Sequence, residues 1–120
     1  MAIEFDHRID KELLRVKATG HDENLEQVQE YGLAVMRAAL ENNCTKIICD
    51  ESDLEYSLGT FDIFELVKSL SEVVPKVVKV ALIYKPTQFD DVKFWENVAV
   101  NRGVQVRIFK DQASAEKWIE

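Results

Sequence analysis

The sequence contains few of the residues from which metal and redox sites are built. Only two cysteines and two histidines occur among its 120 residues. Cys44 and Cys49 would supply two ligands without a nearby histidine, so a structural zinc site lacks half of its parts. A reduced pair is the ordinary state of cysteines in the cytoplasm. We therefore expect no metal ion and no cofactor.

Long apolar runs are also missing. No segment approaches the roughly 20 apolar residues that a membrane-spanning helix requires. The first residues, Met1 to Asp6, have neither the cationic nor the apolar region of a signal peptide. These absences predict a cytoplasmic protein without a membrane span.

Glycine is scarce, and the four glycines do not form a known catalytic or phosphate-binding motif. Gly-x-Gly-x-x-Gly and Gly-x-x-x-x-Gly-Lys-Ser/Thr are absent, which removes the two main nucleotide-cradling signatures. Gly-x-Ser-x-Gly is absent as well, which excludes a nucleophile elbow. With no acid, base and oxyanion donor that can be assembled, an enzyme is the least favoured of three functional hypotheses.

Basic residues are outnumbered by acidic ones, 15 to 22, and the formal net charge is −7. Such a chain repels nucleic acids and anionic bilayers unless its basic residues are segregated, and they are not. We therefore expect no nucleic-acid partner. The length and the balance of 47% hydrophobic and 31% charged residues predict a single folded domain over residues 1–120.

The hydrophobic pattern predicts an α/β fold with the element order ββαβαβαβα. Two alternating runs, residues 3–8 and 14–18, predict an antiparallel hairpin. After it, helices over about 25–41, 60–72, 88–102 and 112–119 alternate with strands over 47–50, 77–84 and 104–108. This alternation predicts a mostly parallel five-stranded sheet with four helices. Asn24, Thr60 and Asp111 are predicted N-caps, and Phe61 and Phe64 are predicted to face the core.

Candidate site residues gather after the strand that ends at Asp50. In open α/β sheets ligands bind beyond the carboxyl ends of the strands. Asp50 could be a catalytic carboxylate or a loop cap, and the cap is favoured because no second carboxylate or histidine stands at a known spacing. Ser57, Gly59 and Thr60 could hold an anion or simply begin the next helix.

Aromatic residues in the same half of the chain allow two interpretations. They either line a hydrophobic cavity between the sheet and the second and third helices or form ordinary core, which is the commoner case. The residues are Tyr56, Phe61, Phe64, Phe89 and Trp95.

Three segments carry a resemblance to a known family: residues 55–62 (EYSLGTFD), residues 78–84 (VKVALIY) and residues 101–111 (NRGVQVRIFKD) followed by Ala115 and Trp118. Together they resemble the STAS-like, or SpoIIAA-like, family of small bacterial proteins, over nearly the whole chain. The resemblance implies the fold of the anti-sigma-factor antagonists and of related lipid-carrier domains.

The resemblance also implies a site. In the antagonists the loop after the central strand carries an Asp-Ser pair, and phosphorylation of that serine by a partner kinase disrupts the complex. The equivalent region here is residues 50–62, in which no Asp-Ser pair occurs. Thr60 and Ser57 are therefore the candidate phosphoacceptors.

Two hypotheses lead. The first is a non-enzymatic interaction module that presents residues 50–62 and the following helix to a protein partner. The second is a carrier or sensor of a small apolar, lipid-like ligand held between sheet and helices. A homodimer is compatible with either. The predicted partner- or ligand-binding residues are Asp50, Tyr56, Ser57, Leu58, Gly59, Thr60, Phe61 and Asp62.

Overall fold

The computed structural model describes residues 3–22 and 24–120 of the chain. Its elements follow the predicted order ββαβαβαβα, with one added 3-10 turn, η1 (Pro86–Gln88). The strands are β1 (Glu4–Asp10), β2 (Leu13–His21), β3 (Lys46–Glu55), β4 (Lys79–Tyr84) and β5 (Gln105–Phe109). The helices are α1 (Leu25–Glu41), α2 (Thr60–Ser71), α3 (Phe89–Asn101) and α4 (Gln112–Ile119).

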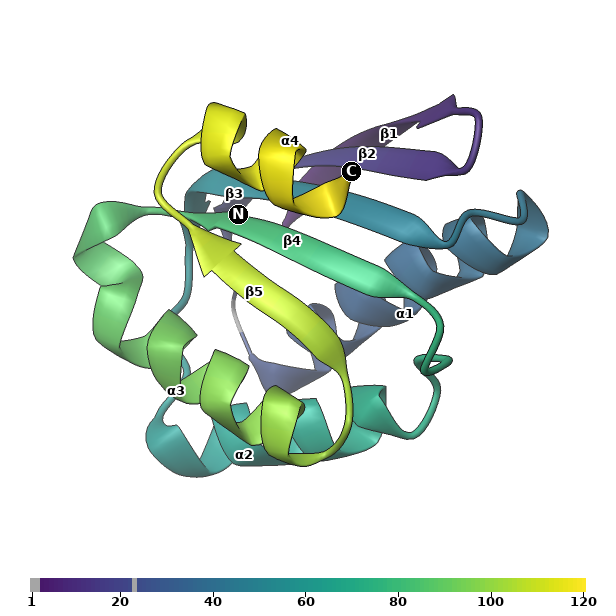
Figure 1. Ribbon diagram of the computed structural model, residues 1–120. Coiled ribbons are helices and arrows are strands. Elements are labelled where there is room, and N and C mark those ends of the chain that lie inside the picture. Colours follow the sequence, from purple (N-terminus) through teal and green to yellow (C-terminus); the bar gives the residue numbers. More distant parts are fainter. Residues whose placement is uncertain (1–2, 23) are drawn as a thin grey trace.

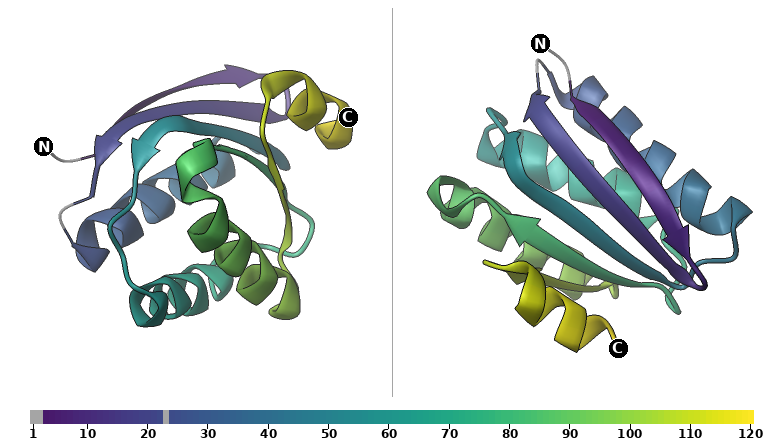
Figure 2. Two further views of the ribbon diagram at one scale, coloured as in Figure 1. Left: turned by 90° about the vertical axis from the view of Figure 1, so that its left-hand side faces the viewer. Right: turned by 90° about the horizontal axis from the view of Figure 1, so that it is seen from above.

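The strands form one mixed sheet in the order β1-β2-β3-β4-β5. β1 and β2 make the predicted antiparallel hairpin, and every later pair is parallel. Helices α1, α2 and α3 cover one face of the sheet, and α4 covers the other (Figures 1 and 2). The predicted fold class is thereby confirmed, and the loops that follow β3 and β4 lie at the same edge of the sheet.

Local sequence signals set several helix ends. The Asn24 side chain accepts a hydrogen bond from the N–H of Gln27 at 3.0 Å, and the Asp111 side chain accepts one from the N–H three residues later at 2.8 Å. Both are the predicted N-caps. Asn43 (φ 55°) and Gly103 (φ 86°) adopt the left-handed conformation after α1 and α3. Asparagine and glycine tolerate that conformation best, so the helices end there.

Two apolar layers pack against the sheet. The larger lies beneath α1, α2 and α3 and includes the fully buried Leu14 and Ile47. The smaller lies beneath α4 and includes Ile48, Ala115 and Ile119. Neighbouring residues of β3 thus point to opposite layers, as the two-residue period of a strand requires.

Strand β3 is longer than predicted. It continues past Asp50 to Glu55 and pairs with β2 as far as His21 opposite Glu55. The predicted end of this strand at Asp50 was therefore wrong, and the loop before α2 is limited to residues 56–59. The physical reason is that Glu51 and Leu54 are both buried. Residues 51–55 are mostly polar, so their hydrophobic pattern does not indicate a strand.

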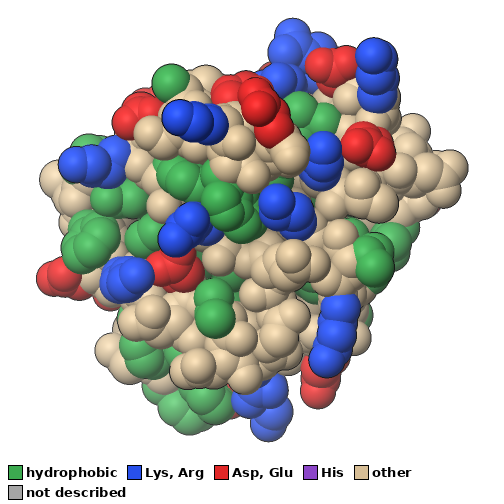
Figure 3. Space-filling model, viewed as in Figure 1, with side chains coloured by type: hydrophobic (Ala, Val, Ile, Leu, Met, Phe, Trp, Pro, Cys, Tyr) green, Lys and Arg blue, Asp and Glu red, His purple; other side chains and the backbone are tan. Residues whose placement is uncertain are grey.

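Charged side chains of both signs are mixed on the surface formed by α3, α4 and β5 (Figure 3). Lysines and arginines there stand apart from one another, with aspartates and glutamates among them. No helix in the described part of the chain is long and apolar enough to cross a bilayer.

Candidate functional site

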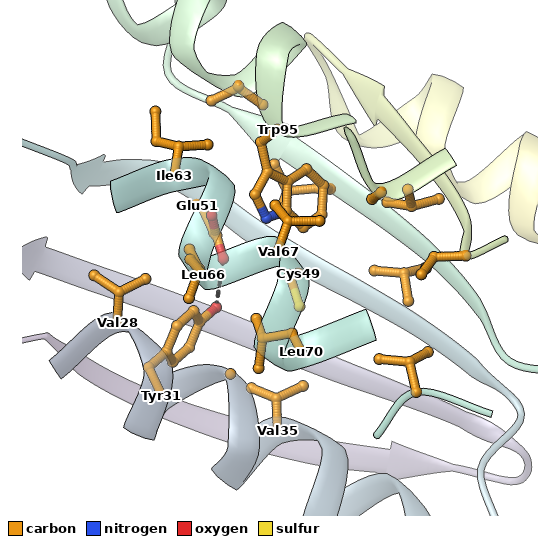
Figure 4. Close-up of a pocket in the computed structure, with 18 of the residues that line it drawn as sticks. Val28, Tyr31, Val35, Cys49, Glu51, Ile63, Leu66, Val67, Leu70 and Trp95 are labelled. Atoms are coloured by element: carbon orange, nitrogen blue, oxygen red, sulfur yellow. Dashed lines mark hydrogen bonds between the residues drawn. The ribbon is translucent and has the colours of Figure 1, made fainter. Parts of the chain in front are cut away.

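A cavity of about 120 Å³ lies in the larger apolar layer, between the sheet and helices α1 to α3 (Figure 4). Its walls are almost entirely apolar. They include Val28 and Val35 from α1, Ile63, Leu66, Val67 and Leu70 from α2, Trp95 from α3, and Ile47, Val80, Leu82 and Val106 from the strands. Small-molecule sites have the same kind of lining, apolar with few polar groups, although most are larger.

One end of the cavity is polar because Glu51 of β3 reaches it. The hydroxyl group of Tyr31 donates a hydrogen bond to Glu51 Oε2 at 2.7 Å, and that of Tyr56 donates to Oε1. Glu51 is 3% exposed. A buried carboxylate requires such donors, because the loss of water would otherwise cost several kcal/mol.

Glu51 changes charge near neutral pH. Burial raises the pKa of its carboxyl group to about 7, although the hydrogen bonds from Tyr56 and Tyr31 act in the opposite direction. Burial, followed by the charge of Glu51, raises the pKa of both phenols well above their usual range. Burial also raises the pKa of the Cys49 thiol, which lines the same cavity. The phenols and the thiol therefore stay protonated while Glu51 titrates.

Glu51 and Tyr31 are not among the predicted site residues, although both have a detectable signal in the sequence. Ile47 and Cys49 line the cavity, and the two-residue period of the strand places Glu51 on the same face. Tyr31 follows Val28 by three residues and precedes Val35 by four, which is the spacing of one helix face. A glutamate and a tyrosine at core positions of two facing elements could have been recognised as a pair.

Of the five aromatic residues considered in the sequence, some line the cavity and the others lie outside it. Tyr56 and Trp95 line the cavity, as one of the two interpretations of the sequence expected. Phe61, Phe64 and Phe89 lie outside it and are 72%, 38% and 44% exposed. The cavity therefore draws on α1 and on aliphatic side chains of α2, while the aromatic residues that line it from the predicted set come from the loop and from α3.

Asp50 lies on the opposite face of β3 from Glu51. Its Oδ1 atom accepts hydrogen bonds from the N–H and the hydroxyl group of Ser52 at 3.1 and 2.6 Å, and its Oδ2 atom lies 3.3 Å from Lys17 Nζ. Burial opposes ionisation of Asp50, but the hydrogen bonds from Ser52 and the charge of Lys17 outweigh it, so the pKa is lowered. Lys17 also contacts Asp53 at 2.9 Å. These contacts occupy Asp50 within the sheet, away from the cavity.

The loop of residues 56–59 is attached to two other elements. The backbone N–H and the hydroxyl group of Ser57 donate to Asp22 Oδ1 at 2.8 and 2.9 Å, and the N–H of Tyr56 donates to Gln88 Oε1 at 2.9 Å. Asp22 is 2% exposed, and its Oδ2 atom has no hydrogen-bond partner among the described residues. The loop thus joins the β2–α1 connection to η1, with the Tyr56 side chain reaching inward to Glu51.

The start of α2 differs from the prediction. The N-cap is Gly59, which has no side chain to donate or accept, and the exposed Thr60 is the first helical residue. The buried residues of α2 are Ile63, Leu66 and Val67, so the predicted core positions of Phe61 and Phe64 were wrong. Leu58 is 8% exposed and packs in the same cluster as Ile63. Burial of Leu58 just before the helix fixes the rotation of α2, and Phe61 consequently points outward.

Of the eight predicted site residues, the structure places seven together. Tyr56, Ser57, Leu58, Gly59, Thr60, Phe61 and Asp62 form the loop and first turn of α2. Within this group, Ser57, Thr60 and Phe61 are exposed, Tyr56 and Asp62 are partly buried, and Leu58 is buried. Asp50 lies apart from them, inside β3. Among the described residues, no group of three or more His, Cys, Asp and Glu side chains is placed to hold a metal ion.

Known structures share this architecture. An anti-sigma factor antagonist from Mycobacterium paratuberculosis is similar with a TM-score of 0.67 and 12% identity, over 98% of this chain and 94% of that one. The anti-sigma factor antagonist SpoIIAA in its unphosphorylated form is similar with a TM-score of 0.56 and 15% identity, over 96% of each chain.

An uncharacterized protein of the DUF3478 family from Shewanella loihica PV-4, which has a SpoIIAA-like fold, is similar with a TM-score of 0.54 and 19% identity. That likeness covers 99% of this chain and 94% of the other. No protein-family model matches the sequence, and no curated protein matches it significantly. The chain therefore has the SpoIIAA-like fold that its sequence resemblance implied.

Proposed function

We propose that the chain is a non-enzymatic regulatory module that binds a protein partner through residues 50–62 and helix α2. The outward-facing pair of Phe61 and Phe64 carries the proposal. These residues are one turn apart on α2, and 72% of Phe61 is exposed. Exposed aromatic side chains are frequent anchors of protein interfaces. The pair adjoins the exposed Ser57 and Thr60, so a partner would contact loop and helix together.

The structural neighbours support a role of the same kind. Two of them are anti-sigma factor antagonists, a name that implies a protein partner for those proteins. Their fold covers almost the whole of this chain, which gives the segment after β3 the same place at the sheet edge. A regulatory partner for this chain is consistent with that arrangement.

The chemistry of the cavity favours binding over catalysis. A cysteine acts as a nucleophile when its thiol ionises readily, whereas burial raises the pKa of Cys49. The hydrogen-bond partners of Glu51 are two phenols, Tyr31 and Tyr56, which also stay protonated. Neither the Cys49 thiol nor either phenol is therefore a ready nucleophile beside Glu51.

Thr60 and Ser57 differ as phosphoacceptors within this role. Thr60 is exposed at the first position of α2, where the helix dipole favours negative charge. Ser57 already donates its hydroxyl proton to the buried Asp22. A phosphate on Ser57 would replace that hydrogen bond with a repulsion between like charges. Thr60 is therefore the better acceptor, and Ser57 the position where a phosphate would disrupt the loop.

A matched pair of variants tests the partner surface. Phe61→Ala removes the exposed ring beside the loop, and Val77→Ala removes an equally exposed side chain, 70%, just before β4 at the opposite edge of the sheet. A tagged protein produced in its native cells should capture a specific partner that Phe61→Ala loses and Val77→Ala keeps. Equal capture by the two variants would reject this surface.

A second candidate function is a carrier or sensor of a small apolar ligand, and the cavity of about 120 Å³ favours it. Native mass spectrometry of protein purified gently from its own cells tests this function. A co-purifying small molecule supports it. A bare protein that also fails to bind added hydrocarbons of the cavity's size would reject it. The same spectrum reports whether the protein is a monomer or a homodimer.

A further inference from the structure

The carboxyl group of Glu51 forms the polar end of the cavity. No salt bridge joins Glu51 to a lysine, arginine or histidine among residues 3–22 and 24–120. Its hydrogen bonds come from two neutral phenols, Tyr31 and Tyr56. Each carboxylate oxygen has more than one lone pair, so it can accept a further hydrogen bond. Ionised Glu51 is therefore a buried negative charge that can still receive a cation.

Three aromatic residues line the cavity together with this charge. Tyr31, Tyr56 and Trp95 all line the cavity together with Glu51, and Figure 4 shows the Tyr31 hydroxyl directed at the Glu51 carboxylate. Aromatic faces attract ammonium groups, and the attraction is stronger where water is excluded. A carboxylate beside several aromatic rings is thus a chemical environment suited to an organic ammonium ion.

The size of the cavity limits the body of the ligand. In another protein, an engineered cavity of about 150 Å³ holds benzene, and the cavity here measures about 120 Å³. A cavity of this size limits the ligand body to about a single ring or a short branched chain, and it is too small for a fatty-acyl chain. The apolar side chains of α2, such as Leu66 and Val67, would contact that body.

We propose that the cavity binds a small molecule with a positively charged amine on a compact apolar body, and that the ammonium group lies at Glu51. This proposal rests on the carrier or sensor function and names the chemical class of its ligand. The ammonium group would donate to the free lone pairs of Glu51 and supply the positive charge that the protein lacks there. The apolar body would fill the space between α1, α2 and α3.

Amine binding would depend on pH because it selects the ionised form of Glu51. Tyr31 from α1 and Tyr56 from the loop face Glu51, and its strand neighbour Cys49 lines the same cavity. Asp50 lies on the opposite face of the strand and acts on Glu51 through its charge, which raises the pKa of Glu51. Tyr84 pairs with it from β4, and Asp91 of α3 lines the same cavity. The pKa of Glu51 is about 7, so amine affinity should rise from pH 6 to pH 8. The affinity for an uncharged ligand of equal shape should not rise.

Three molecules of nearly the same shape separate the amine from its apolar body: benzylamine, benzyl alcohol and ethylbenzene. Their dissociation constants would be measured by calorimetry at pH 6 and pH 8. At pH 8 we expect benzylamine to bind at least ten times more tightly than benzyl alcohol or ethylbenzene. Binding of ethylbenzene without this preference would overturn the amine proposal and leave the carrier function intact. If none of the three binds, both fail.

Two variants test the role of the carboxylate. Glu51→Gln keeps the shape of the side chain and should abolish the tenfold preference while retaining ethylbenzene binding. Glu96→Gln is the matched control, because Glu96 is also buried at 7% exposure but lies outside the cavity, bound to Lys93 and the N–H of Ile108. A preference that survives Glu51→Gln would contradict the proposal.

A measurement on the unmodified protein guards against a variant that fails to fold. The carboxyl carbon of Glu51, labelled with ¹³C, reports its titration by NMR. Saturating benzylamine should lower the titration midpoint by at least one pH unit, which corresponds to a tenfold preference for the ionised form. A midpoint that stays constant or rises would place the ammonium group elsewhere.

Discussion

The hydroxyl group of Tyr31 on α1 lies 2.7 Å from Oε2 of Glu51 on β3. This hydrogen bond crosses from the helical layer to the sheet at the end of the cavity. A second tyrosine, Tyr56, approaches the same carboxylate from the loop that leads to the proposed partner surface. Tyr31, Glu51 and Tyr56 therefore connect the cavity to residues 56–62. Variants at the cavity and variants at the proposed partner surface can both test this connection.

The stability of the free protein should fall as the pH rises from 5 to 8. The pKa of Glu51 is about 7 in the folded protein and ordinarily 4.5, so between these values the folded state binds more protons than the unfolded state. Stability then decreases with pH, by about 3 kcal/mol over the whole range. Urea unfolding at each pH unit measures the slope. Glu51→Gln should flatten this decrease, and Glu96→Gln should keep it. A stability that rises from pH 5 to pH 8 would contradict the raised pKa of Glu51.

Removal of either phenol hydroxyl should raise the pKa of Glu51 further. Both hydrogen bonds stabilise the ionised carboxylate and lower its pKa, so Tyr31→Phe and Tyr56→Phe each remove a donor that stabilises the negative charge. Each change should also cost about 1–3 kcal/mol of stability at pH 8, because a buried oxygen loses its donor. NMR titration of Glu51 checks the direction. A lower pKa in either variant would show that the hydrogen bond is absent in solution.

Filling the cavity should abolish ligand binding without unfolding the protein. Val67 is 2% exposed and lines the cavity from α2. The phenylalanine ring that Val67→Phe introduces therefore has empty space to occupy. We expect ethylbenzene binding to disappear and the unfolding temperature to stay constant or rise. Ile48→Phe provides the contrast beneath α4, where an oversized side chain should cost about 1–3 kcal/mol. Equal destabilisation by the two changes would indicate that the cavity is closed in solution.

Negative charge should have opposite effects at the two candidate phosphoacceptors. Ser57→Asp places a carboxylate against the buried Asp22 and removes the hydroxyl group that donates to it, so the unfolding temperature should fall. Thr60→Asp adds charge at the start of α2, where the dipole favours it by a few tenths of a kcal/mol. Thermal unfolding distinguishes them. Equal effects would mean that the hydrogen bond between Ser57 and Asp22 does not restrain the loop.

The order of elements could be predicted because local signals agree with it. The alternation in the hairpin, the caps at Asn24 and Asp111, and the left-handed residues Asn43 and Gly103 all lie within a few positions of the ends they define. Short-range signals of this kind depend on backbone conformation and need no knowledge of the tertiary packing.

The site was less predictable because its residues take their roles from tertiary contacts. A glutamate after Asp50 is ordinarily a loop residue, and Glu51 becomes a core residue only when tyrosines from two other segments donate to it. The rotation of α2 likewise depends on where Leu58 is buried. Helical spacing fits either Phe61 or Ile63 as the first core position, so the sequence pattern alone does not decide between them.

The proposed partner surface is tested most directly by cross-linking from Phe61 inside the native cells. A photoreactive benzoyl group on the phenylalanine at this position preserves the exposed ring, and the same amino acid at Val77 provides a control of equal exposure. After illumination, we expect a single heavier species that forms from position 61 and not from position 77. No cross-linked species from position 61, or the same species from both positions, would contradict the account.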